Sequence, residues 1–131
     1  MRARLSASIC AAFLGLAFVA TNALAHHGWA GQGTEDFTLK GKVSKALSLQ
    51  GPHATMQITD EKGQVWDLTL APPPGTERSG LKEGLIPMGA EVSILGKRNL
   101  DPKKFEVKTE RVTYNGKDYD VYPDRVPSKS K

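Results

Sequence analysis

Hydrophobic and polar residues alternate along much of the chain, which is the pattern of half-buried β-strands. Over residues 37–49 most apolar side chains fall on odd positions, and this predicts a long strand that bends or bulges near Gly41. Two further alternating runs, 53–59 and 65–70, flank a turn sequence at 60–63 that ends in glycine. We expect these two runs to pair as a β-hairpin.

The alternation stops in the next part of the chain. Three consecutive prolines at 72–74 remove three backbone donors, so the sheet cannot continue through them. Thr76 can serve as an N-cap, and the segment 76–85 is predicted to form a short helix. The alternation returns over residues 90–98, which predicts a fourth strand.

Residues 104–114 form the last long run of strand type. Its apolar positions change parity along the run, and this predicts a bulge near Glu110. The Asn-Gly dipeptide at 115–116 favours a type I′ turn, after which residues 117–122 are expected to return as a short strand. Residues 123–131 show no such pattern, and we expect them to be a disordered tail.

The predicted order is three strands, a short helix, two strands and a final edge strand. In an OB-fold the helix lies between the third and fourth strands and closes one end of a small barrel. The predicted fold class is therefore all-β, a small OB-fold-like barrel of five to six strands with one short helix between strands three and four. A β-sandwich remains the alternative, because sequence patterns locate strands better than they show barrel closure.

The first 25 residues have the pattern of a secretory signal peptide. Arg2 and Arg4 precede an apolar run over residues 9–20, and Ala23 and Ala25 form a small-residue cleavage pattern. The apolar run is shorter than the ~20 residues that a membrane-spanning helix needs, so we expect no transmembrane anchor. Cleavage after Ala25 predicts a periplasmic protein.

Removal of this segment leaves 106 residues, enough for one domain. We expect a mobile N-terminal arm over 26–36, a barrel domain over 37–122 and the tail. The only cysteine, Cys10, lies in the signal segment, so no disulfide is expected. Residues 1–25 hold two of the 18 basic and none of the 14 acidic residues, which leaves a net charge of +2. Basic residues are scattered along the chain, which argues against a nucleic-acid partner.

Three histidines, His26, His27 and His53, are the candidate metal ligands. After cleavage at Ala25, His26 would offer both its α-amino and its ring nitrogen to one ion, and His53 could complete a set of three nitrogens. His27 is the weaker candidate for the same ion, because neighbouring residues of an extended arm project to opposite sides. Copper stands highest in the affinity order for such nitrogen sites, so copper is the predicted cofactor. Surface histidines without a shared role are the alternative.

Other chemistry has weaker support. Met56 alternates with polar neighbours and is expected in the core, while Met88 lies in a turn. Three aspartates at 118, 120 and 124 are expected to be solvated carboxylates, because the glycine and glutamate of an EF-hand loop are missing. The sequence contains no nucleophile elbow, no zinc-protease motif and no P-loop.

The sequence resembles a family of small periplasmic bacterial proteins classed as a domain of unknown function. The resemblance rests on Ala25-His26-His27, on Leu-Lys-Gly-Lys-Val at 39–43, on Pro52-His53, on Gly-Gln-Val-Trp at 63–66 and on Pro-Met-Gly-Ala-Glu-Val at 87–92. It implies export and an OB-like barrel, and it implies no activity. The chain has Gly51 where the family usually carries an asparagine before Pro-His.

These observations predict an exported periplasmic protein that binds copper through its N-terminal histidine site and acts as a carrier or sensor and not as an enzyme. A periplasmic protein is the second partner considered, beside the metal ion. The alternative is a metal-free interaction or ligand-binding module that uses the barrel face and the segment 72–85. Alanine at His26 and His53 should abolish copper uptake in the first case and leave partner binding unchanged in the second.

Overall fold

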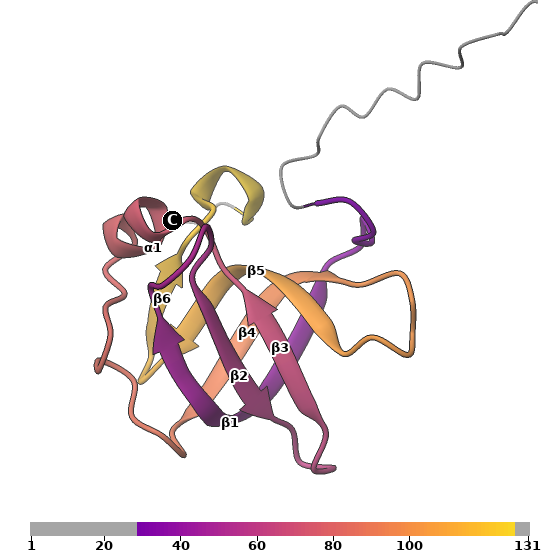
Figure 1. Ribbon diagram of the computed structural model, residues 1–131, viewed down its shortest axis with the longest axis horizontal. Helices are drawn as coiled ribbons and strands as arrows, with labels where there is room; N and C mark the ends of the chain where they lie inside the picture. The colour runs from indigo at the N-terminus through magenta and orange to yellow at the C-terminus, as the bar shows by residue number, and fades with distance from the viewer. Residues whose placement is uncertain (1–28, 128–131) are drawn as a thin grey trace, which may run out of the picture.

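The computed structural model describes residues 29–127 and shows a small β-barrel with one short α-helix in that range (Figure 1). The elements are, in chain order, β1 (Phe37–Ser48), β2 (Thr55–Thr59), β3 (Val65–Thr69), α1 (Pro73–Arg78), β4 (Glu91–Arg98), β5 (Glu106–Tyr114), β6 (Lys117–Asp120) and the 3₁₀ turn η1 (Pro123–Arg125). The expectation of a mostly β fold is confirmed. No helix of the described residues is long and apolar enough to cross a membrane.

The sheet closes into a barrel because β5 pairs with both β4 and β3. The strand order is β3-β2-β1-β4-β5-β6, and β3 also pairs in parallel with the first residues of β5. Five strands therefore form a closed barrel, and β6 is added beside the second half of β5. Closure removes the free edges that an open sheet of these strands would expose.

Strand β1 is long enough to serve two partners. Its first half pairs with β4 and its second half with β2. A bend or bulge was expected near Gly41, and the irregularities in register lie after Val43 and after Lys45. Gly41 has a different role, since a Cβ at this position would lie 2.6 Å from the carbonyl oxygen of Thr59. The missing side chain therefore allows β1 and β2 to approach each other closely.

The core consists of the alternating apolar residues of the strands, as the sequence pattern predicts. Val43 and Leu47 of β1 are buried, and Met56 is 2% exposed, so its assignment to the core is correct. Buried residues of all six strands and of the connection after α1 form one cluster, which includes Ile58, Leu68, Leu81, Val92, Ile94, Val107, Val112 and Tyr119. Burial of this apolar surface is the main source of folding free energy.

The predicted bounds of the helix, 76–85, are wrong. Helix α1 occupies Pro73–Arg78, begins within the triple proline and ends before Gly80. Proline at the first helical positions is favourable, because the first backbone N–H groups have no partner inside the helix. Thr76 is therefore not the N-cap but a buried residue whose hydroxyl donates to the carbonyl oxygen of Ala71.

The bulge near Glu110 and the turn after β5 are both present. In the pairing of β4 with β5, Leu95 lies opposite Arg111 and Gly96 opposite Thr109, so Glu110 is the extra residue. Asn115 and Gly116 both have positive φ, 51° and 75°. Positive φ at both central positions is the requirement of a type I′ turn.

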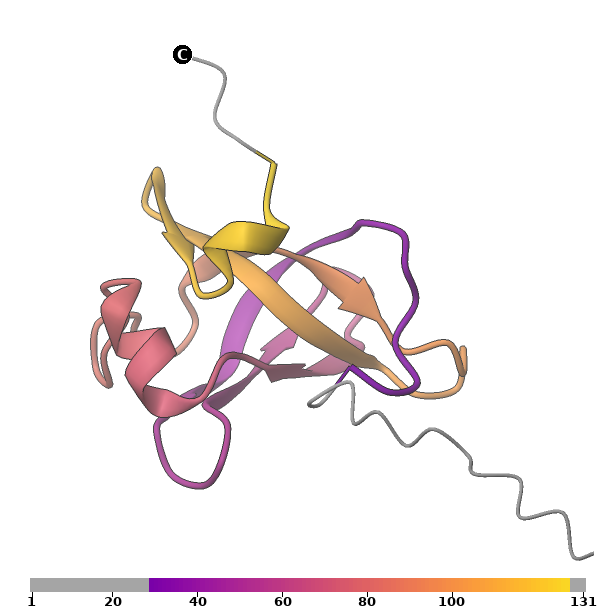
Figure 2. The ribbon, with the colours of Figure 1, turned by 90° about the horizontal axis from the view of Figure 1, so that it is seen from above.

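Both ends of the described chain contact the barrel, and the remaining parts of the predicted arm and tail lie outside the described residues. In the N-terminal segment the backbone N–H of Gly33 donates to Arg98 O, and Gln32 forms a β-bridge with Asn99. Near the C-terminus, residues 123–125 form η1, drawn in yellow above β5 in Figure 2. The predicted signal segment 1–25, His26, His27 and residues 128–131 lie outside the described residues.

The side chain of Arg98, the last residue of β4, lies at the end of the barrel where β4 connects to β5. Figures 1 and 2 place this connection on the opposite side from α1. The Arg98 guanidinium lies 4.7 Å from the ring centre of Trp66 and donates to Pro102 O. Phe37 and Phe105 flank the same guanidinium at 5.7 and 5.5 Å. We call these four residues the Arg98 cluster.

Candidate functional site

His53 lies two residues before β2 and is partly buried. The backbone of the next residue, Ala54, exchanges hydrogen bonds with Ala71 and Leu70, and this extends the β2–β3 hairpin to the histidine. The Nδ1 atom of His53 lies 3.0 Å from the carbonyl oxygen of Leu70. The hairpin therefore fixes both the backbone and the ring of this predicted ligand.

A buried lysine of β5 contacts the same ring. The Lys108 side chain is only 2% exposed, and its Nζ lies 3.2 Å from His53 Nδ1 and 3.5 Å from Leu70 O. Burial, together with the positive charge of Arg125, lowers the pKa of Lys108 to about 8. Removal from water disfavours the charged form of an amine, which explains the direction of the shift.

The contacts around Leu70 O are compatible with two tautomers of His53. In one, Nδ1–H donates to Leu70 O, and Nε2 keeps a free lone pair. In the other, the Lys108 ammonium donates to Nδ1 and to Leu70 O, and Nε2 carries the proton. Only the first tautomer can bind a metal ion through Nε2.

Two aromatic rings from opposite ends of the described chain cover Lys108. The rings of Trp29 and Tyr122 meet edge to face at 5.1 Å, and the Lys108 Nζ lies 5.5 Å from the centre of each. The guanidinium of Arg125 stacks on Trp29 at 3.9 Å. We call His53, Lys108, Trp29, Tyr122 and Arg125 the terminal cluster.

The structure thus places one predicted ligand, His53, in a cluster that includes the start of the described chain. His26 and His27 lie outside the described residues, three and two positions before Trp29. Within residues 29–127 no group of three or more histidine, cysteine, aspartate or glutamate side chains could hold a metal ion. A complete metal site would therefore need ligands from the residues before Trp29.

A second buried charge lies on β5 two residues after Lys108. Glu110 is 0% exposed, and neither carboxylate oxygen has a hydrogen-bond partner in the described part of the chain. Its closest counter-charge is Lys97, whose Nζ lies 3.9 Å from Oε1 and also contacts Asp36. Burial raises the pKa of Glu110, and the charge of Lys97 reduces this rise only in part.

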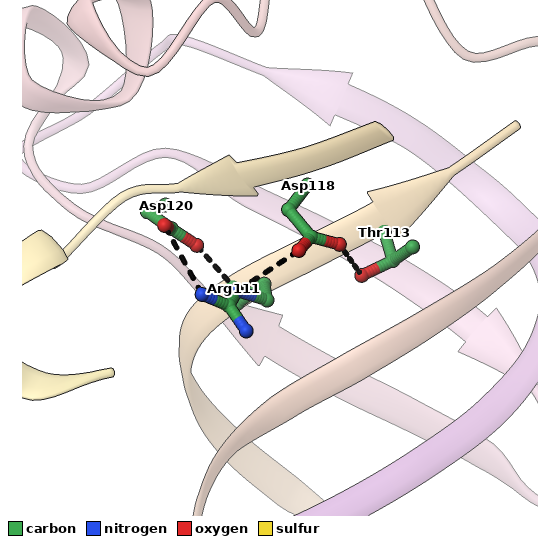
Figure 3. A network of polar contacts seen from close by, with 4 residues as sticks. All are labelled: Arg111, Thr113, Asp118 and Asp120. Atoms are coloured by element: carbon green, nitrogen blue, oxygen red, sulfur yellow. Dashed lines mark hydrogen bonds and ion pairs between the residues drawn. The ribbon is translucent and has the colours of Figure 1, made fainter. Parts of the chain in front are cut away.

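The acidic residues of the β5–β6 hairpin are paired, which corrects the expectation that they are simply solvated. Arg111 donates to both carboxylate oxygens of Asp120, at 2.5 and 3.2 Å (Figure 3). Asp118 accepts a hydrogen bond from the Thr113 hydroxyl at 2.7 Å and lies 3.8 Å from Arg111. This network holds β6 against β5, and it offers no open carboxylate cage for calcium.

A surface groove of about 520 Å³ runs between α1 and the end of β6. Pro72, Pro74 and Arg78 line one wall, and Tyr122 and Asp124 line the other. The groove therefore borders the terminal cluster through Tyr122. It uses the start of the segment 72–85 that the sequence suggested for ligand binding.

Sequence reasoning missed Lys108, Glu110 and Arg125, and it assigned no role to Trp29. Lys108 and Glu110 stand in a strand whose polar residues normally face solvent, so their local pattern carries no signal of burial. The segments that cover them come from the two ends of the chain. The presence of an aromatic residue near each end, Trp29 and Tyr122, was the only available signal, and it is weak.

Comparison with known proteins adds one finding. No curated protein matches the chain. A family model described as a family of unknown function, DUF6152, matches residues 12–107, which is more than half of the chain. The chain therefore belongs to this family of unknown function.

Proposed function

We propose that the chain is an exported periplasmic protein that binds copper through His53 and the N-terminal histidines, and that it carries or senses the metal. The observation that carries this proposal is the contact of Trp29 with Lys108, which itself touches His53. His26 precedes Trp29 by three residues, and three residues span up to ~10 Å. In this proposal the docked tryptophan brings His26 within reach of the His53 ring.

The surroundings of His53 also support a role as ligand. Metal-binding histidines usually donate their second ring N–H to a carbonyl or carboxylate, which fixes the tautomer and the orientation of the ring. Leu70 O lies in position to accept such a bond from Nδ1 at 3.0 Å. In that tautomer Nε2 would keep the lone pair that binds the ion.

The donor chemistry favours copper. An N-terminal α-amino group with two imidazoles offers three nitrogen ligands, and Cu(II) binds such sets more tightly than other divalent first-row metals. The exposed Met88 thioether lies in the connection before β4 and has no part in this set.

We further propose that the barrel is an OB-fold. Strand β1 pairs with both β2 and β4, β3 and β5 pair in parallel to close the barrel, and α1 follows β3 in the chain. These features are those expected of a five-stranded Greek-key barrel of this class. In the proposal the fold is a rigid support that holds His53 and the docked N-terminal segment together.

Titration of Cu(II) into the exported and processed protein tests the metal function. Mass spectrometry first verifies that the chain begins at His26. We expect one tight site that is lost in His53→Ala, while Met88→Leu, the matched surface control, binds as the wild type does. A Trp29→Ala variant should keep the fold but bind copper roughly 10–100-fold more weakly, because supporting residues of metal sites have effects of this size.

Two results would contradict the proposal. Absent or weak binding to a chain that begins at His26 excludes the copper site. Tight binding that is unchanged in His53→Ala would mean that the N-terminal residues bind the metal alone and that no ligand comes from the barrel.

The groove between α1 and β6 favours a second candidate, a metal-free binding module. Its proline-rich wall and the arginine and aspartate at its rim would suit an extended peptide. In this case Arg78→Ala would weaken partner binding, and alanine at His26 and His53 would not.

A further inference from the structure

Glu110 lies where the two ends of the described chain meet β5. We call residues 29–36 and 121–127 the terminal segments. The backbone carbonyl of Glu110 accepts the N–H groups of Val121 and Tyr122, at 3.0 and 3.2 Å, which fixes the C-terminal segment to the β5 bulge. Its carboxylate is 0% exposed, and neither oxygen has a hydrogen-bond partner within residues 29–127. An ionised Glu110 therefore lacks the donors that bulk water would provide.

Charged side chains from three other parts of the fold face this carboxylate. Lys97 of β4 lies 3.9 Å from Oε1, and its ammonium also contacts Asp36 of the N-terminal segment. Arg125 of η1 attracts the carboxylate, whereas Asp36 repels it. On β5 itself the neighbouring charged residues are Lys108 and Arg111. One shared lysine and the charge of an arginine do not replace hydration, so burial still raises the pKa of Glu110.

The terminal segments contact each other outside the barrel, and Figure 2 shows the C-terminal one above β5. The ring of Trp29 meets that of Tyr122 edge to face at 5.1 Å, and the guanidinium of Arg125 lies 3.9 Å from the centre of the Trp29 ring. Chain ends that are held by a few such contacts open more easily than the strands of a closed barrel. Opening would hydrate Glu110 and would uncover Lys108, which lies under the same two rings.

We propose that the terminal segments form an acid-closed strap, in which a protonated Glu110 keeps them on β5 and ionisation of Glu110 favours their release. The open strap returns the carboxylate to water. It also gives access to the terminal cluster, so this access increases as the pH rises. The inference does not depend on a metal ion, because every group in it lies within residues 29–127.

The direction of the pH effect follows from the proton that Glu110 binds. The closed strap raises the pKa of Glu110 above 4.5, whereas the hydrated carboxylate of the open strap has the ordinary value. Below pH 4.5 both forms are protonated, so the strap is most stable there. At higher pH the open form loses its proton first, and the equilibrium constant for opening rises by up to about tenfold per pH unit, the limit for one proton. The rise ends above the pKa of the closed form.

Hydrogen exchange of backbone amides, followed by NMR on the processed full chain in metal-free buffer, measures the opening from about pH 4 to about pH 8. Protection factors correct for the pH dependence of the exchange chemistry itself. The amides of Val121 and Tyr122 report the strap, and that of Val43, which donates to Ala90 O, reports the barrel. We expect the two strap amides to be at least about tenfold less protected than Val43 at every pH, because the strap opens without the barrel. Their protection should fall by up to about tenfold per pH unit above pH 4.5.

Three variants assign the pH dependence to Glu110. Glu110→Gln removes the proton equilibrium, so its strap amides should have the same protection at every pH. Glu35→Gln, which changes an exposed carboxylate of the N-terminal segment, is the matched control and should behave as the wild type does. Asp36→Asn removes a repelling charge and leaves Lys97 to Glu110 alone, so the rise in opening should end at a lower pH.

Three results would overturn the strap. Equal protection of the strap and barrel amides means that only global unfolding hydrates Glu110. An unchanged pH dependence in Glu110→Gln assigns the effect to another group. If that variant does not fold, an Asp36→Asn profile equal to that of the wild type leads to the same conclusion.

Discussion

Two clusters of the molecule place cations among aromatic rings, and they differ in what surrounds them. In the Arg98 cluster, the arginine of β4 lies over Trp66 of β3, and its guanidinium also donates to a backbone carbonyl. In the terminal cluster, Lys108 lies under Trp29 and Tyr122, which belong to the two ends of the described chain. The first is built from residues in or next to the barrel strands, and the second also includes residues from the two ends of the described chain.

The difference indicates which of the two clusters is the better candidate for a ligand-binding site. Trp66 is 4% exposed, its Nε1 donates to Asp60, and its ring belongs to the core cluster. The terminal cluster instead holds a lysine with a lowered pKa and a histidine with alternative hydrogen bonds. Shifted pKa values and unpaired buried charges are more typical of sites that bind ligands than of cores that only stabilise a fold.

The largest effect should come from the Arg98 cluster. We expect Trp66→Ala to reduce the free energy of unfolding by about 3–5 kcal/mol, because it removes a buried aromatic ring and leaves a cavity. Urea unfolding measures this value, with Val65→Ala, the exposed neighbour on β3, as the control. A loss no greater than that of Val65→Ala would contradict the structural role of this cluster.

A smaller loss is expected where the barrel supports the terminal cluster. A Cβ on Gly96 would lie 2.1 Å from the backbone carbonyl oxygen of Lys108, so β4 and β5 must separate to accept alanine. We expect Gly96→Ala to cost about 1–3 kcal/mol of stability, as overpacking does, and to displace Lys108. Ser93→Ala on the same strand is the control, and equal unfolding midpoints for the two variants would refute the prediction.

Glu110 provides a test that depends on pH. Its pKa is raised above the ordinary value of 4.5, so the folded state loses stability as the pH rises above 4.5, and the loss is complete above the folded-state pKa. Glu110→Gln should therefore stabilise the protein by about 1 kcal/mol at neutral pH, the scale of an unsatisfied buried group. The advantage should decline as the pH falls and vanish below pH 4.5.

Unfolding curves over a pH series measure this difference, and Glu91→Gln, on the exposed side of β4, is the control. A gain that does not depend on pH would show that the carboxylate is not the cause.

The smallest effect is expected at the Arg111 network, which lies outside both clusters. A double-mutant cycle of Arg111→Gln and Asp120→Asn should give a coupling energy of about 0.2–1 kcal/mol, as for other partly exposed ion pairs. High salt should reduce this coupling further, because the pair is partly screened by solvent. A coupling as large as the loss in Trp66→Ala would place this hairpin among the main supports of the fold.

Much of the barrel could be predicted, because its determinants are local. The alternation of apolar residues located all six strands, the change of parity located the bulge at Glu110, and Asn115-Gly116 specified the turn. The bounds of α1 could not be found in this way. The prolines that end β3 also begin the helix, and pattern analysis assigned them only the first role.

The candidate site shows where such reasoning ends. His53 could be singled out from its residue type, but the burial of Lys108 and Glu110 depends on segments that are close in space and distant in the chain. No local pattern encodes which polar face of a strand a terminal segment will cover.

By itself, the sequence determined the strands, their turns and the side of each strand that enters the core, because a period of two residues decides which side chains share a face. Only the tertiary structure decided that β3 meets β5 to close the barrel and that Trp29 and Tyr122 come together over Lys108. The physical reason is that closure and the packing of the terminal segments depend on the total surface that they bury. That quantity exists only once distant segments lie in contact.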